Sequence, residues 1–237
     1  MAQVSQRTVF NGSALVRLLS RLTDIDVREP RQATADRLSQ WFGWTDAISL
    51  SAALDGASAA APSRVRASTS AEERECVRAR AALANAVAED GAVKSAADFT
   101  PFRRRHLSLQ QAMEAGIGPL RGRLRALLAA RSPAMARLAA VDVVMEQVLA
   151  AREHSLLGAV PALLEKHFTR LREASLDGLN GLERAGEPDS EAHQAGEWLH
   201  VFRKDMKNVL LAELDFRFQP IEGLLEALRM RQPECHE

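Results

Sequence analysis

The sequence predicts an all-α protein, with short N-terminal helices followed by a helical bundle built on a long antiparallel hairpin. Three observations support this prediction. Apolar residues recur at helical spacing along most of the 237 residues, helix-start signals are frequent, and the alternating pattern of strands is nearly absent. With 46% hydrophobic and 26% charged residues, the chain can bury a core and is not a disordered polyelectrolyte. Aromatic residues are sparse (eight Phe, three Trp and no Tyr), so we expect a core mostly of Leu, Ala and Val.

The N-terminal segment, residues 1–54, is expected to form short helices and to carry an aromatic cluster. Ser13 can cap a first helix, and Pro30 opens a second one. The apolar positions of the first helix are Leu15, Leu18, Leu19 and Leu22, and those of the second are Leu38, Trp41, Phe42, Ile48 and Leu54. Residues 55–69 are rich in Ala and Ser and have no apolar period, which indicates a flexible linker.

Residues 70–237 are predicted to form the helical bundle. Ser70 and Glu73 match a capping box, in which each side chain satisfies a free amide of the first turn. A further helix begins at Pro101, since a proline at the first helical position loses no hydrogen bond. Glycine and proline cluster at residues 116–119, so we expect an interruption there.

The long hairpin is predicted over residues 133–231. Its first arm starts at a Ser-Pro pair, and Gly158 with Pro161 predicts a kink or short break. Residues 186–190 read as a turn, and the second arm is expected to bend at Pro220. The Leu and Val stripes of the arms could pair the protein with a second copy or with another protein, and the sequence leaves both hypotheses open.

The sequence predicts a cytoplasmic protein that does not insert into a membrane. The N-terminus is polar, and no stretch approaches the roughly 18 consecutive apolar residues of a membrane span. Cys76 and Cys235 are the only cysteines and lack a CxxC spacing, so we interpret them as thiols of a reducing compartment.

The net charge of zero hides two blocks of opposite sign. Residues 98–137 hold eight arginines against two acidic residues, whereas residues 138–200 hold five basic and 11 acidic residues. Arginine can bind phosphate or carboxylate through two hydrogen bonds at once. The basic block therefore indicates either a surface for nucleic acid or an acidic partner, or internal neutralisation by the acidic block, which we favour. The candidate binding arginines are Arg103, Arg104, Arg105, Arg121, Arg123 and Arg125.

No catalytic motif is found in the sequence. Glycine-rich phosphate loops, nucleophile elbows and recognisable Cys/His pairs are all absent. The nearest approach to a metal site is His193, Glu197 and His200, whose spacing places them on one helix face. Di-iron bundles need two Glu-x-x-His motifs and further carboxylates, and only one such motif occurs. We therefore expect no enzyme activity, metal or cofactor, and keep a metal-dependent helical-bundle enzyme as an alternative.

Trp41, Phe42 and Trp44 place three aromatic side chains within four residues. They cannot all face one side of a helix, because each residue turns the helix by about 100°. Either two of them lie in the core and the third covers a helix junction, or Trp41 or Trp44 stays exposed as an anchor for a partner. Trp is enriched among the residues that dominate binding energy at interfaces.

Four stretches of the N-terminal region carry a family resemblance. They read FNGSALVRLL at 10–19, EPRQ at 29–32, RLSQW at 37–41 and TDAISLSAAL at 45–54. They resemble a proteobacterial family catalogued as a domain of unknown function, and the likeness covers most of the chain. Members of that family have been linked to type III Zorya anti-phage systems, as a soluble partner of a membrane-embedded, proton-driven motor complex. The resemblance implies this role and transfers no functional residue.

We therefore expect a non-enzymatic cytosolic component of a Zorya-type anti-phage defence system. It would act downstream of the membrane motor complex by binding protein or nucleic acid, with other defence-system proteins or the motor complex itself as partners. One alternative from a different class is a DNA-binding effector that uses the arginines of residues 98–137. Its affinity for DNA would fall steeply with salt, since it would rest on phosphate contacts.

Overall fold

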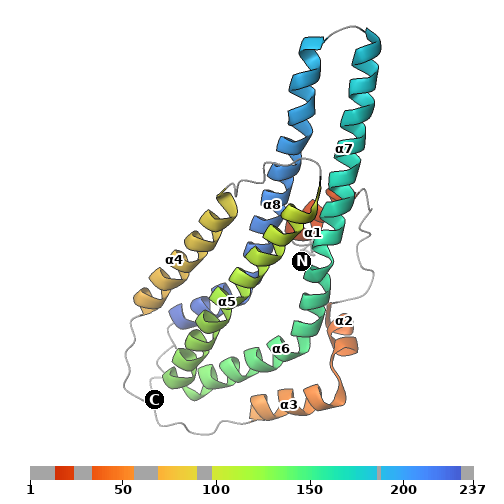
Figure 1. The fold of residues 1–237 in the computed structure, drawn as a ribbon. Coiled ribbons are helices and arrows are strands. Elements are labelled where there is room, and N and C mark those ends of the chain that lie inside the picture. Colours follow the sequence, from red (N-terminus) through yellow and green to blue (C-terminus); the bar gives the residue numbers. More distant parts are fainter. Residues whose placement is uncertain (1–13, 24–33, 56–68, 90–97, 186–187, 231–237) are drawn as a thin grey trace, which may run out of the picture.

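The computed structural model describes residues 14–23, 34–55, 69–89, 98–185 and 188–230, which form eight helices and no strand (Figure 1). The all-α class is therefore confirmed. The helices are α1 (Ala14–Thr23), α2 (Thr34–Trp41), α3 (Trp44–Asp55), α4 (Thr69–Ala88), α5 (Thr100–Arg131), α6 (Pro133–Gly158), α7 (Val160–Ala185) and α8 (Pro188–Arg229). Residues 56–68, which include most of the predicted linker, lie outside the described part.

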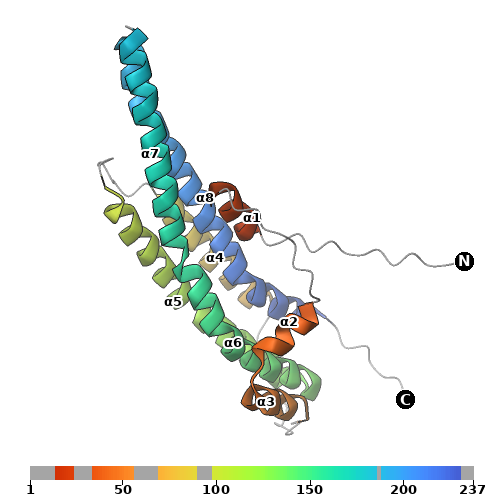
Figure 2. The same ribbon diagram turned by 90° about the vertical axis from the view of Figure 1, so that its right-hand side faces the viewer.

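A long antiparallel hairpin organises the bundle. Helices α6 and α7 form its first arm and α8 its second, and the upper parts of α7 and α8 project beyond the other helices (Figures 1 and 2). The first arm breaks at Ala159, whose amide donates to the carbonyls of Leu156 and Leu157. The kink predicted from Gly158 and Pro161 is thus confirmed, because the proline leaves the α-helical ladder without one of its donors.

The interruption expected at residues 116–119 is wrong, since α5 runs through this segment without a break. Pro119 lies on the exposed side of α5, and so does Ala115, whose carbonyl loses its helical donor. Water can satisfy that carbonyl, while Ile117 and Leu120 on the other side remain buried and hold the helix together. Pro220, where a bend is expected, lies within α8, which continues past it to Arg229.

The second helix expected in the N-terminal segment is divided in two, because Phe42 and Gly43 are not helical. Gly43 caps α3: its carbonyl accepts from the amide of Ala47 at 3.0 Å, and its amide donates to Asp46 Oδ2 at 2.9 Å. A side chain three residues into a helix that binds the cap amide is half of a capping box. The division places Trp41 at the end of α2 and Trp44 at the start of α3.

The core lies between α5, α7 and α8, and aromatic rings concentrate at one level of it. Phe202 has no exposed surface and contacts the rings of Phe99, Phe102 and Phe168, with centroid distances of 5.1–6.1 Å. Trp198 packs edge-on against Phe168 at 5.2 Å. Leucines fill most of the remaining core, as expected, and Leu15 joins it from α1.

Replacing Phe202 with Ala should lower the free energy of unfolding by about 3–5 kcal/mol, because the truncation leaves a cavity among three packed phenylalanine rings. Urea denaturation monitored by circular dichroism measures this loss. The neighbouring Val201 is 38% exposed, so Val201→Ala serves as the control and should stay within about 0.5 kcal/mol of the wild type. Equal losses in the two variants would contradict the packing described here.

Candidate functional site

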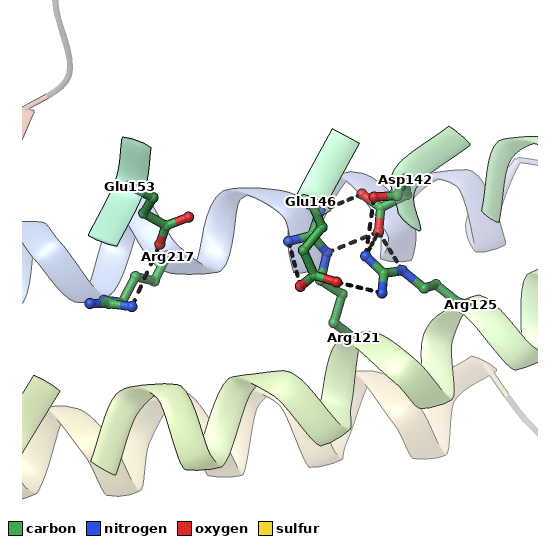
Figure 3. A network of polar contacts seen from close by, with 6 residues as sticks. All are labelled: Arg121, Arg125, Asp142, Glu146, Glu153 and Arg217. Carbon is green, nitrogen blue, oxygen red and sulfur yellow. Dashed lines mark hydrogen bonds and ion pairs between the residues drawn. The ribbon is translucent and has the colours of Figure 1, made fainter. Parts of the chain in front are cut away.

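Two arginines of the basic block pair with two carboxylates of the acidic block across the α5/α6 interface (Figure 3). Arg121 donates from Nε and a terminal nitrogen to the two oxygens of Asp142, at 2.9 and 2.7 Å. Arg125 donates to Asp142 Oδ2 at 2.7 Å and to Glu146 Oε2 at 2.7 Å. Arg121 also reaches Glu146 Oε1 at 3.1 Å. Two positive and two negative groups thus close a neutral network between consecutive helices.

Both arginines and Asp142 are largely buried in this network. Burial alone would raise the pKa of Asp142, but hydrogen bonds from Arg121 and Arg125, together with their charge, hold it below its ordinary value. Burial likewise opposes the charge of Arg121, and the hydrogen bond and charge of Asp142 outweigh it and raise the pKa of Arg121. The contacts between Arg121 and Asp142 therefore stabilise the charged form of both groups. Removing one partner would leave a buried charge uncompensated, which is strongly destabilising.

Three further arginines of the basic block bind neighbouring helices. Arg105 donates to the carbonyls of Ala86 and Glu89 at the C-terminal end of α4, and Arg131 donates to the carbonyl of Leu228 near the end of α8. Positive side chains at helix C-termini satisfy free carbonyls and interact favourably with the helix dipole. Arg123 lies 3.6 Å from a carboxylate oxygen of Glu72 and 3.9 Å from one of Glu75 on α4.

The structure therefore supports internal neutralisation for much of the basic block. In the structure Arg121 and Arg125 are paired with Asp142 and Glu146, whereas their prediction as binding residues assumed an open surface. Arg103 and Arg104 are exposed, and neither forms an ion pair with any residue that the structure describes.

A second polar network is buried in the core around Glu213 of α8, which has no exposed surface. Gln110 of α5 donates to its two carboxylate oxygens at 3.0 and 3.1 Å and to the carbonyl of Leu157 at 3.1 Å. Arg217 donates to Glu213 Oε1 at 3.1 and 3.0 Å. The ring of His106, also fully buried, places Nε2 3.5 Å from Glu213 Oε2.

Burial raises the pKa of Glu213, but the adjacent His106, the hydrogen bonds of Gln110 and the charge of Arg217 outweigh this effect and bring it below its ordinary value. Arg217 also lies 3.5 Å from Glu153 of α6, as Figure 3 shows. It lies 3.4 Å from Glu114 of α5 as well. The network thus connects α5, α6 and α8. Since Glu213 and His106 are fully covered, it orients helices and does not present a group to a solute.

Sequence reasoning missed this network. A signal was present, because Glu213 is an acidic residue within an apolar run of α8, between Ala212 and Leu214. A charge at a core position of a helix predicts a buried partner. The partner itself could not be predicted, since it depends on how α5 and α8 are aligned.

The two N-terminal tryptophans differ in their surroundings. Trp41 is partly buried, and the guanidinium of Arg152 on α6 lies 4.7 Å from the centre of its ring, a cation–π geometry. Trp44 is 82% exposed, and Ile48, one turn later on α3, is 54% exposed. No residue of α3 is buried, although α3 packs along α6. We call Trp44, Ile48 and the flanking Leu54 (53% exposed) the α3 surface.

Of the three residues predicted as candidate metal ligands, two have side chains that the structure describes. Glu197 and His200 lie on α8 and are exposed, whereas the side chain of His193 is not among those described. Among the described residues, no group of three or more His, Cys, Asp or Glu side chains is arranged to hold a metal ion. In the same part of the chain, no helix combines the length and apolar character needed to cross a membrane.

Residues 1–230 match the sequence profile of a family described as "Protein of unknown function (DUF3348)". Neither a curated protein nor a solved structure matches the chain.

The stability of the protein should fall as the pH drops below the ordinary values of its two buried carboxyls, 4.5 for Glu213 and 3.8 for Asp142. Both pKa values are lowered in the folded state, so their contribution is complete above these values and is lost as the pH falls through the folded ones. Each pKa unit of lowering contributes about 1.4 kcal/mol. Glu213→Gln should therefore flatten the dependence of unfolding free energy on pH below 4.5.

Urea denaturation at a series of pH values between about 2.5 and 6 measures this slope, a range that brackets the ordinary carboxyl pKa values. Glu197→Gln removes an exposed carboxylate of the same helix and should keep the wild-type slope. A wild-type slope in Glu213→Gln would contradict the ionised state of the buried carboxylate.

Proposed function

Because the chain belongs to the DUF3348 family, whose description states no activity, we propose a function from the surface of the molecule: a non-enzymatic protein that binds another protein through α3. The observation that supports this proposal is the 82% exposure of Trp44. Tryptophan is enriched at the centres of protein interfaces, because it buries a large apolar area at a small cost in conformational entropy.

The α3 surface is more than one exposed side chain. Trp44 and Ile48 are four residues apart and therefore lie on the same face of the helix. Leu54, near the end of α3, is a third exposed apolar side chain of this helix. Scattered apolar residues are normal on a protein surface, whereas neighbouring ones on one helix are typical of an interaction site.

Contacts at the start of α3 also hold the α3 surface in position. The Gly43 cap fixes the start of α3, and the contact of Trp41 with Arg152 holds the preceding helix against α6. Trp44 begins the first turn after this cap, so its backbone is defined before any partner arrives. Binding then requires little ordering, and a pre-organised surface loses less entropy on association.

We place this binding in bacterial anti-phage defence of the Zorya type, in the cytoplasm and downstream of the membrane motor complex. The partners would be other proteins of the defence system or the motor complex itself. The support is the resemblance of residues 10–54, whose last stretch, 45–54, forms nearly all of α3. The proposed contact surface thus lies in a segment that carries the resemblance.

Replacing Trp44 with Ala should abolish phage resistance in cells that carry the complete defence system, because the partner loses its main apolar anchor. Plaque formation by a sensitive phage measures resistance, and an Ala substitution at such an anchor typically costs 2 kcal/mol or more of binding energy, about thirtyfold in affinity. A photo-crosslinking residue at Ile48 should join the protein to a co-encoded partner.

Val77→Ala is the matched control, since Val77 is a 68% exposed apolar residue on α4, away from α3. This variant should keep full resistance. If deletion of the whole gene left resistance intact, the defence role would be wrong. If the deletion abolished resistance but Trp44→Ala did not, the role would stand and the α3 surface would be wrong.

A DNA-binding effector remains a second candidate, and it is favoured by the exposure of Arg103, Arg104 and Arg137. Three phosphate contacts predict that the logarithm of the affinity falls with the logarithm of salt with a slope of about −2.7, whereas eight would give about −7. Fluorescence anisotropy with a labelled DNA duplex from about 50 to 200 mM salt measures this slope.

Arg103→Gln combined with Arg104→Gln should reduce the magnitude of that slope by about two, since two phosphate contacts are lost. Arg78→Gln, which removes an exposed arginine of α4, should leave the slope unchanged. Absence of binding at about 50 mM salt would rule this function out.

A further inference from the structure

Helix α4 is joined to α5 and α8 mainly through charged side chains. It runs alongside them on the outside of the bundle (Figure 1). Of its described apolar residues, only Cys76 and Val87 are buried, and Ala79, Leu83, Ala84 and Ala86 are partly buried against the core. The apolar contact is therefore narrow for a helix of 20 residues, and small side chains make most of it.

Ion pairs hold the middle and the start of α4. Arg80 binds two carboxylates of α8, Asp215 and Glu222, each at 2.6 Å. Glu73 accepts from Arg229 of α8 at 2.6 Å. The side chains in these pairs are 31–56% exposed, so water and salt reach them.

The two ends of α4 meet further arginines of α5. At its start, Glu72 faces Arg123 at 3.6 Å. At its end, Arg105 donates to the carbonyls of Ala86 and Glu89. Both signs therefore alternate along the contact: carboxylates of α4 meet arginines, and the arginine of α4 meets carboxylates.

The pattern of attachment predicts that α4 separates from the bundle before the bundle unfolds. Exposed ion pairs contribute little to stability, and salt screens them. Elements with few buried apolar contacts open with a smaller free energy than the core around them. The core between α5, α7 and α8 does not depend on α4. It includes Phe202, Leu124 and Ile221, which have no exposed surface.

We propose that the face of α5 and α8 beneath α4 is a helix-binding site and that α4 is its exchangeable occupant. The site uses none of the residues of the α3 surface. It recognises a helix with apolar residues, most of them small, at the spacing of Cys76, Ala79, Leu83 and Val87. Such a helix needs carboxylates at its start, for Arg229 and Arg123, and a cation about two turns later, for Asp215 and Glu222.

The site also has an apolar floor. The guanidinium of Arg80 lies 5.7 Å from the centre of the ring of Phe218, an α8 residue that is 2% exposed. When α4 leaves, this ring and its neighbours lose their cover, and a helix that replaces α4 restores it. The occupant is thus selected by charge along its edges and by small side chains along its centre.

The reactivity of Cys76 can measure the opening of α4, because this side chain is 4% exposed and faces the bundle while α4 is bound. Burial, together with the nearby Glu72, raises the pKa of its thiol, which slows reaction with alkylating reagents further. Cys235→Ser leaves Cys76 as the single thiol of the chain. Labelling by iodoacetamide, an uncharged reagent, then measures how often α4 opens.

In the Cys235→Ser protein, labelling should become at least severalfold faster from about 0.01 M to about 1 M NaCl, as the Debye length falls from about 30 Å to about 3 Å. Arg80→Gln should raise the rate at low salt about fivefold, the upper range for an exposed ion pair. Arg78→Gln is the matched control, because Arg78 pairs with Glu75 inside α4, and it should leave the rate unchanged.

A synthetic peptide of residues 69–88 with Ser in place of Cys76 should accelerate labelling, because it competes with α4 for the site. The same peptide with Arg80→Glu should not. Global unfolding is measured in parallel by urea denaturation. Labelling that is independent of salt and as slow as global unfolding would overturn the proposal, and so would a peptide without effect. The salt series needs no substitution in α4, so it tests the proposal even if the Arg80→Gln variant fails to fold.

Discussion

The bundle depends on how the chain places its two blocks of opposite charge against each other. Arg121 and Arg125 meet Asp142 and Glu146 directly across the first tight turn of the bundle, and this contact fixes the register of α5 against α6. Both arginines are largely buried, so a shifted register would bury uncompensated charge, at a cost of several kcal/mol. The Glu213 network joins the same two helices to α8, through Gln110 of α5 and Glu153 of α6, so it depends on that register. Charge in this protein therefore specifies geometry more than it adds stability, because buried pairs gain little over apolar packing.

Much of the fold could be predicted from local signals, and the failures have physical causes. The helix starts at Pro101 and Pro133 and the break near Pro161 were predictable, since proline acts on its own turn whatever surrounds it. The interruption at Pro119 was wrong, because the lost hydrogen bond faces water there, and exposure depends on the tertiary fold. The division at Gly43 was missed, since it rests on one side-chain contact from Asp46.

The candidate sites show the same division between local and tertiary information. The charges of residues 98–137 and 138–200 predicted that the two blocks would either pair with each other or face the solvent. They did not predict which arginines would be paired and which would be exposed. Arg121 and Arg125 lie on the face of α5 that packs against α6. Arg103 and Arg104 lie near the start of α5 and are exposed. The sequence predicted that one of Trp41 and Trp44 could stay exposed, and the structure identifies Trp44. His106 and Gln110 gave no signal, because polar residues on a helix are ordinary until their partners are known.

The absence of tyrosine gives the three tryptophans a further consequence, which is optical. Trp198 packs edge-on against Phe168, Trp41 lies beneath a guanidinium, and Trp44 stands in water. Each indole is thus surrounded by groups of different polarity, which sets the wavelength of its fluorescence. No tyrosine contributes to the ultraviolet signal. The red edge of the emission spectrum belongs to Trp44 and the blue edge to Trp198. The protein therefore carries two built-in fluorescent reporters, one on its outer surface and one beside its aromatic core.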